Sequence, residues 1–195
     1  MAEEKIGLLE TQLKLTSQGG GFQTTTEKRD ASIKERRKRL GEAKIVKSKK
    51  KQPTPSKKEL SNLLLLYQNR QLVEAETLAV SLAERFPTHI LSWKVLGAVL
   101  KQTGHVEESL NFTHKTVQLA PHDADAHNNL GITLKELGRL DDAITSINRA
   151  IGLKPDLAEA HSNLANTLIE LERFDEAEAS CNQAIALKPD FAEAH

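Results

Sequence analysis

A 34-residue self-similarity constrains this chain more than any other feature of its sequence. Residues 124–157 and 158–191 are identical at 20 of 34 positions, and prolines recur at the same spacing, at Pro87, Pro121, Pro155 and Pro189. A fixed period of this length is typical of repeat architectures, in which each copy buries its apolar face against the next. The register divides the chain into copies at 56–89, 90–123, 124–157 and 158–191, the first being the most diverged.

Each copy contains two segments in which apolar residues have helical spacing. In the copy that begins at Ala124, positions 4, 7, 8 and 11 fall within one arc at about 100° per residue. A second apolar series runs from Leu140 to Ile151, and Gly138 between the two series is a helix-stopping residue. Pro155 then ends the pair. The sequence therefore predicts an all-α fold built from helix–turn–helix units.

The recurring residues resemble the tetratricopeptide repeat, a 34-residue helix pair. The matching positions are Trp93, Leu96, Gly97 and Pro121 in one copy and Leu130, Gly131, Ala143, Ala150 and Pro155 in the next. The resemblance extends over the four copies and implies a right-handed superhelical solenoid of antiparallel helix pairs. Residues 160–168 are also similar to the repeat arm of the O-GlcNAc transferases, and to bacterial proteins with that arm before a sulfotransferase or glycosyltransferase domain.

Formal charge is divided unevenly along the chain, although its sum is zero. Residues 22–58 hold 14 Lys and Arg against 4 Asp and Glu, whereas residues 59–195 hold 11 against 20. We therefore expect a basic, largely disordered segment over 1–58, with a transient helix near 31–46, followed by the repeat solenoid over 59–195. Two interpretations of the basic segment stay open: a solvated linker, or a contact with nucleic acid or an anionic surface through residues 28–51.

The first helix of each copy has a face that points away from its partner helix, and the resemblance implies that this face lines a concave groove. Asn129 and Asn163 share position 6, where a row of amides can pair with the backbone of an extended peptide whatever its side chains. A similar asparagine ladder is implied by the O-GlcNAc transferase resemblance; the alternative is two solvated asparagines in duplicated sequence. The candidate groove residues are Asn128, Asn129, Asn163, Asn166, Lys94, Lys101 and Lys135.

A carboxylate clamp, as in chaperone-binding repeat domains, is a less favoured use of the same groove. Lys94 and Asn129 match two of its five positions, but Glu159 places an acid where the bound anion would lie. The sequence therefore favours recognition of a peptide backbone over recognition of a C-terminal carboxylate.

No pattern in the sequence indicates catalysis, a cofactor or a metal. We find no nucleophile beside a base, no phosphate-binding loop before a helix and no paired carboxylates in a pocket-forming context. His127, His161 and His195 recur once per repeat where the family packs a ring, so we interpret them as packing residues rather than metal ligands. Cys181 falls at an apolar position of a second helix and is interpreted as a small hydrophobe. We therefore predict a chain that is not an enzyme.

The sequence shows neither a membrane span nor a signal peptide, and we expect a cytoplasmic location. His195 occupies position 4 of a fifth copy, which leaves the preceding second helix uncovered and favours a fragment of a longer protein or homo-association through that face. The predicted function is a protein–protein interaction scaffold that binds an extended polypeptide in its groove. The alternative is the substrate-recognition arm of a protein glycosyltransferase or sulfotransferase whose catalytic domain lies outside this chain.

Overall fold

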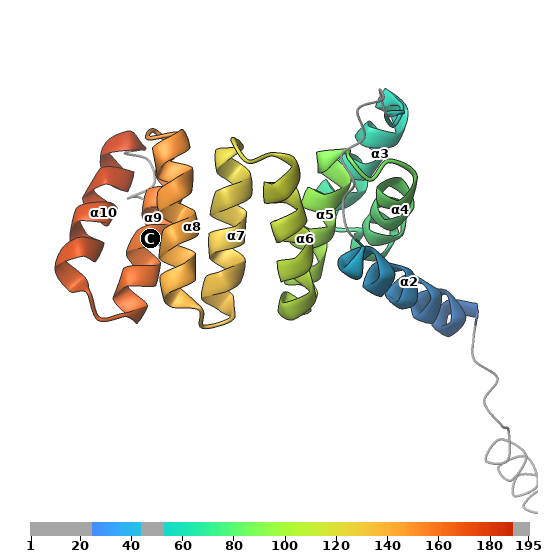
Figure 1. The fold of residues 1–195 in the computed structure, drawn as a ribbon, viewed down its shortest axis with the longest axis horizontal. Helices are drawn as coiled ribbons and strands as arrows, with labels where there is room; N and C mark the ends of the chain where they lie inside the picture. The colour runs from blue at the N-terminus through green and yellow to red at the C-terminus, as the bar shows by residue number, and fades with distance from the viewer. Residues whose placement is uncertain (1–24, 44–52, 189–195) are drawn as a thin grey trace, which may run out of the picture. The chain divides into compact units, whose positions relative to one another are not determined.

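The computed structural model describes residues 25–43 and 53–188, and every regular element within these ranges is a helix. α2 (Thr25–Glu42) lies in the basic segment. The helices after it form consecutive pairs that lie side by side in chain order (Figure 1). The pairs are α3 (Lys57–Gln68) with α4 (Leu72–Arg85), α5 (Ile90–Gln102) with α6 (Val106–Leu119), α7 (Ala124–Glu136) with α8 (Leu140–Leu153), and α9 (Ala158–Glu170) with α10 (Phe174–Leu187).

The helix pairs coincide with the predicted copies, so the all-α solenoid predicted from the repeat is confirmed. All of them belong to one compact unit, residues 37–195. The second helices α4, α6 and α8 also contact the first helix of the following pair. Ile147 and Ala150 of α8, for example, form one apolar cluster with Leu157, the N-cap residue of α9, and with Ala160 of the next copy. Every copy therefore completes the core of its neighbour, which is how a solenoid gains stability.

The turn inside each pair places one residue in the left-handed backbone region. Gly104 and Gly138 have φ angles of 79° and 71°, whereas Arg70 and Glu172, at the same repeat position, have φ angles of 56° and 59°. Glycine adopts this region freely, but a residue with a Cβ loses about 1–2 kcal/mol there. The predicted break at Gly138 is confirmed. The geometry of the pair imposes the turn even in the copies that lack glycine.

Gly131 marks a close approach between α7 and α8. A Cβ at this position would lie 2.4 Å from Ile147 Cγ1 and 3.1 Å from the carbonyl oxygen of Ala143. In the fourth copy the matching positions hold Ala165 and Cys181, so a larger residue on the first helix accompanies a smaller one on the second. The two positions compensate in size because the space between two packed helices is close to fixed.

Ser56 and Glu59 cap α3, the first helix of the array. The Glu59 amide donates to Ser56 Oγ at 3.3 Å, and the Ser56 amide donates to Glu59 Oε2 at 2.8 Å, which makes a capping box. Arg85 of α4 also donates to Glu59 Oε1 at 2.7 Å. The hydrogen bonds from the Ser56 backbone, the Ser56 hydroxyl and Arg85 lower the pKa of Glu59 to about 2. The charged carboxylate thus joins the start of α3 to the end of α4.

We expect this capping box to make part of the stability depend on acid pH. The pKa of Glu59 is lower in the folded chain than its ordinary value of 4.5, so its contribution is present above that value and is lost as the pH falls toward 2. The thermal unfolding midpoints of the wild type and of Glu59→Gln should therefore differ near neutral pH and converge near pH 2. Glu74→Gln, which removes an exposed carboxylate from α4, serves as the control. A Glu59→Gln difference that stays constant with pH would contradict the prediction.

The basic segment contains more helix than its sequence predicts. The transient helix expected over 31–46 corresponds to α2, which begins at Thr25 and ends at Glu42. The basic cluster at 47–51 and residues 1–24 lie outside the described residues. The prediction that most of residues 1–58 is disordered therefore stays a prediction.

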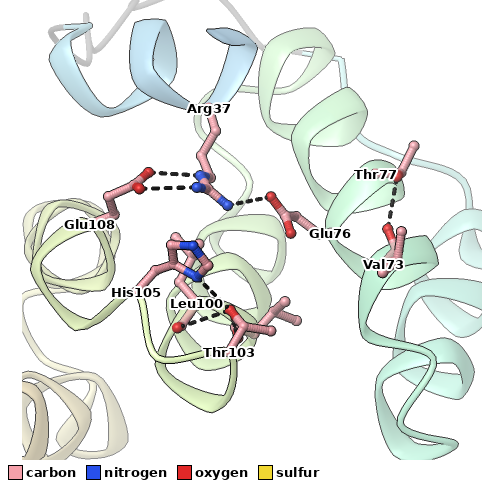
Figure 2. A network of polar contacts seen from close by, with 9 residues as sticks. Arg37, Val73, Glu76, Thr77, Leu100, Thr103, His105 and Glu108 are labelled. Carbon is pink, nitrogen blue, oxygen red and sulfur yellow. Dashed lines mark hydrogen bonds and ion pairs between the residues drawn. The ribbon is translucent and has the colours of Figure 1, made fainter. Parts of the chain in front are cut away.

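Arg37 near the end of α2 is buried, and its charge is balanced by two glutamates. It is therefore not available to nucleic acid or an anionic surface, which corrects the expectation for residues 28–51 at this position. Its side chain is 5% exposed, and its guanidinium donates to Glu76 at 2.7 Å and to both oxygens of Glu108 at 2.7 and 3.0 Å (Figure 2). Lys115 of α6 donates to the carbonyl oxygen of Ala43, just after the last turn of α2. A buried guanidinium needs such charged partners, and only the fold could supply them.

Cys181 is exposed, in line with the expectation that the second helix of the last copy has an uncovered face. The matching residue one copy earlier, Ile147, is fully buried because Ala160 of the following copy and Leu157, the residue before that copy, pack against it. No helix follows α10 within residues 53–188, so Cys181 lacks this cover, and Ile185 is 39% exposed. The burial of a second helix is thus decided by the next copy. The fifth copy lies outside the described residues, and homo-association through this face stays a prediction.

Candidate functional site

Two neighbouring pockets hollow the outward face of the first helices. The first has a volume of about 430 Å³ and lies over α3, α5 and α7. It is lined by apolar side chains and by several polar ones at its margin. The apolar wall is formed by Leu64, Leu91, Val95 and Ala98, and the polar margin includes Tyr67, Lys94, Lys101, Gln102, Asn129 and Thr133.

The second pocket has a volume of about 440 Å³ and lies between α7 and α9. Its lining is almost entirely polar, with acids and lysines from both copies. The lining residues are Asp125, Asn128, Asn129, Lys154, Asp156, Leu157, Glu159 and Lys188. Asn129 belongs to both pockets and therefore lies at the boundary between an apolar hollow and a charged one.

The predicted ladder asparagines differ in the hydrogen bonds that they already make. Asn129 is exposed, and its side chain makes no hydrogen bond with any described residue. Asn163 Nδ2 donates to Asn128 Oδ1 at 3.0 Å, which leaves the Asn163 oxygen as an acceptor. Asn128, also predicted for the groove, is only 8% exposed because Asn163 covers it, so its carbonyl oxygen is not available to a ligand. Asn166 is exposed but lines neither pocket.

The predicted groove lysines are each paired with an acid at the neighbouring first helix, which sequence analysis did not foresee. The ion pairs are Lys94 with Asp123 at 2.5 Å, Lys101 with Glu136 at 3.7 Å, and Lys135 with Glu170 at 3.1 Å. Burial raises the pKa of Asp123, but the hydrogen bonds from Lys94 and from the Ala126 amide outweigh it, and the pKa lies below its ordinary value. These lysines therefore connect each first helix to the next first helix or to its N-cap, and they are less available to a ligand than the sequence suggested.

A hydrogen bond between uncharged side chains joins the first helices α3 and α5 in a similar way. Gln102 Nε2 donates to Tyr67 Oη at 2.8 Å, and the two residues are 35 positions apart. Lys135 and Glu170 have the same separation. In repeat numbering such a contact joins position 12 of one first helix to position 13 of the next. Complementary polar residues 35 positions apart were therefore the sequence signal for this row of contacts along the groove.

The ring at position 4 donates a hydrogen bond in each of three copies. Trp93 Nε1 donates to the carbonyl oxygen of Pro87 at 2.9 Å. The Nε2 atoms of His127 and His161 lie 3.1 Å and 3.0 Å from the corresponding proline carbonyls. Because a carbonyl oxygen only accepts, each imidazole carries a proton on Nε2. The structure gives His127 and His161 a hydrogen-bonding role at this position, their interpretation as packing rings stays a prediction, and His195 lies outside the described residues.

Models of one repeat family match the part of the chain with the most regular helix pairs. Models described as tetratricopeptide repeat match residues 158–191 and 115–145, and a model described as TPR repeat matches residues 133–171. The chain contains tetratricopeptide repeats. In these repeats Trp93, His127 and His161 hold the position of the signature tryptophan, and the two pockets lie on the outward face of the first helices. Among curated proteins, none matches this sequence.

Solved structures of MamA share this tetratricopeptide repeat fold. MamA from Desulfovibrio magneticus RS-1, from residue 41 to its end, is 20% identical with a TM-score of 0.62, over 68% of this chain and 75% of that chain. A further MamA crystal structure is 16% identical with a TM-score of 0.64, over 89% of this chain and 99% of that chain. MamA AMB-1 is 23% identical with a TM-score of 0.57, over 67% and 72% of the two chains. At these identities the likeness establishes the fold alone.

The described helices offer neither a metal site nor a membrane span. Within residues 25–43 and 53–188, no three His, Cys, Asp or Glu side chains gather as a metal site. In the same ranges, no helix combines the length and the apolar character that a membrane span requires. The polar and apolar hollows around Asn129 are therefore the candidate site that the described residues offer.

Proposed function

We propose that this chain is a protein-interaction scaffold whose tetratricopeptide repeats hold an extended polypeptide along the outward face of α5, α7 and α9. The observation that carries the proposal is Asn129, an exposed amide without an internal partner at the boundary between two pockets. An amide offers two donors and one acceptor group, so it can bind both the N–H and the C=O groups of a passing main chain.

Asn163 supports the same geometry one copy further along the groove. Asn163 lines neither pocket, but because its Nδ2 is held by Asn128, its oxygen is the atom left to accept a hydrogen bond from a ligand N–H. An extended segment has unpaired main-chain groups to offer, whereas a helix pairs most of its own. At roughly 1 kcal/mol per net hydrogen bond, two amides supply only part of the affinity. Side-chain contacts in the pockets must supply the rest.

The test uses peptides selected from a random 12-residue library displayed on phage, with the immobilised full chain as target. We expect the best soluble peptide to bind Asn129→Ala, Asn163→Ala about 10- to 30-fold more weakly than the wild type, from the loss of roughly 1 kcal/mol per hydrogen bond. Fluorescence polarisation measures the affinity. Far-UV circular dichroism checks that the helix content is unchanged, since both residues lie on the outward face.

The matched control is Asn148→Ala, Asn182→Ala. These two asparagines are separated by one repeat, as Asn129 and Asn163 are, but both are exposed and lie on the second helices α8 and α10. The control should bind the peptide as the wild type does. Selected peptides that bind both double variants equally well would refute the proposal that Asn129 and Asn163 bind the peptide main chain.

The other predicted roles receive no support from the described residues. The matched repeat models and the MamA structures contain no transferase in their descriptions, so the transferase-arm alternative stays a prediction. For contact with nucleic acid or an anionic surface, Arg37 is already paired with Glu76 and Glu108, and residues 44–52 lie outside the described ranges. The cytoplasmic location also stays a prediction.

A further inference from the structure

We infer that the segment held in this groove carries an aliphatic side chain and a basic side chain about three residues apart. The inference rests on the proposed function, because it names the side chains of the polypeptide that the groove holds. The inference is based on the difference between the two pockets that meet at Asn129, since one is mainly apolar and the other is lined by charged side chains.

The first pocket offers a ligand mainly hydrocarbon. Its polar groups are largely engaged, since Lys94 pairs with Asp123 at 2.5 Å and Gln102 donates to Tyr67 at 2.8 Å. Leu64, which lines it, remains 39% exposed. Filling the space with an aliphatic side chain removes this apolar surface from water, whereas a charged side chain would meet no free counter-charge there.

The second pocket has an excess of acid. It contains three acids and two lysines, a net formal charge of 2 − 3 = −1. Both lysines act on Glu159. The hydrogen bond that Lys188 donates to Glu159 is the main cause of the lowered pKa of that glutamate, and Lys154 adds a smaller electrostatic effect. Asp125 and Asp156 make no ion pair with any described residue. A basic side chain would therefore find two carboxylates that form no ion pair with a described residue, in a pocket whose two lysines act on Glu159.

The spacing of the two features follows from the repeat. Neighbouring packed helices lie about 8–10 Å apart. An extended chain in the polyproline II conformation advances about 3.1 Å per residue and completes one turn in three residues, so its side chains three residues apart lie on the same side. Moving from one pocket to the next along the groove therefore takes about three residues. The charge of residues 59–195, 11 Lys and Arg against 20 Asp and Glu, gives a net charge of −9 that also attracts a basic segment.

The same contacts disfavour an acidic ligand or a C-terminal carboxylate. Lys94, the strongest candidate for holding an anion, is already bound to Asp123. Glu159, one copy further, would repel the anion. The carboxylate clamp considered from the sequence therefore lacks a free cation at its first position.

The test is to determine the amino-acid sequences of the library peptides that the full chain enriches. We expect Leu, Ile, Val or Met three residues from Arg or Lys, in either order. In the best soluble peptide, replacing the aliphatic residue by serine should weaken binding at least tenfold, and replacing the basic residue by glutamate should weaken it about tenfold. Enrichment of acidic peptides, or of peptides without this spacing, would overturn the inference.

Two groove variants test which pocket is responsible for the preference for an aliphatic side chain and which for the preference for a basic one. Ala98→Phe fills the first pocket and should reduce the penalty for the serine peptide to about twofold. Asp125→Asn, Asp156→Asn should remove the discrimination against glutamate, whereas the matched control Asp141→Asn, Asp175→Asn, which removes two exposed acids from second helices, should retain it. If the glutamate peptide still binds more weakly to the Asp125→Asn, Asp156→Asn variant, the second pocket does not cause the preference for a basic side chain.

The outcomes separate this inference from the proposed function. Peptides that depend on Asn129 and Asn163 but lack the aliphatic and basic pattern would overturn the inference and leave the scaffold function intact. Peptides that bind without any dependence on Asn129 and Asn163 would refute both.

Discussion

Gly131→Ala is expected to lower the free energy of unfolding by about 2 kcal/mol through overpacking, although alanine is the better helix former. The new Cβ would lie 2.4 Å from Ile147 Cγ1 and 3.1 Å from the Ala143 carbonyl oxygen, so α7 and α8 must separate or Ile147 must leave its rotamer. Overpacking of this kind costs about 1–3 kcal/mol. The higher helix propensity of alanine offsets about 1 kcal/mol of the gross loss. Urea unfolding followed by circular dichroism measures the difference.

The fourth repeat indicates how this loss can be reversed. It combines alanine with cysteine at the matching positions, as Ala165 and Cys181. We therefore expect Gly131→Ala, Ile147→Cys to be no less stable than Ile147→Cys alone, with a coupling of about 2 kcal/mol between the two sites. Additive losses in this double-mutant cycle would show that the two positions do not share one space.

Gly152→Ala is the matched control for the glycine substitution. Gly152 is also within a helix, α8, but a Cβ there would meet nothing within 4 Å. This variant should gain up to about 1 kcal/mol from helix propensity. Equal effects of the two alanine substitutions would contradict a steric origin for the loss at Gly131.

Trp93→Ala is expected to lower the free energy of unfolding by about 4 kcal/mol, the largest effect that we predict. The Trp93 side chain is 1% exposed and stacks on Phe112 with ring centroids 6.0 Å apart. Its ring also lies 5.5 Å from the Lys115 ammonium, and its N–H donates to the Pro87 carbonyl. Truncation leaves a cavity and an unpaired carbonyl oxygen. Circular dichroism is the suitable probe, because Trp93 is the only tryptophan.

Trp93→His separates the ring hydrogen bond from the ring volume. Histidine holds this position in the next two repeats and donates to the corresponding proline carbonyl there. The histidine variant should therefore lose clearly less stability than Trp93→Ala. His127→Ala, at the same repeat position but only partly buried, should lose about 1 kcal/mol. Equal losses for Trp93→His and Trp93→Ala would show that the hydrogen bond contributes nothing at this site.

The outward face of the first helices could be predicted in outline but not residue by residue. Periodicity predicted Asn129 and Asn163 for that face; Asn129 is exposed and lines both pockets, whereas Asn163 is partly buried and lines neither. Asn128 lies at its edge, where the neighbouring copy decides exposure, and Asn163 covers it. A pattern within one helix contains no information about that neighbour.

The charges show the same limit. Lys94, Lys101 and Lys135 are on the predicted face, yet their partners lie about one repeat away in sequence. Composition counted Arg37 among free basic residues, whereas Glu76 and Glu108 from two different helices enclose it. Charge counts describe segments and do not assign pairs.

The sequence by itself determined the division into helix pairs, the turn at Gly138 and the ring at position 4. These features depend on residues within a few positions of one another, or on a period that repeats along the chain. The tertiary structure alone decided which groove amide is free, which lysines are engaged and that Arg37 is buried. Each of these depends on contacts between different helices, and the packing of the copies, not local periodicity, sets their geometry.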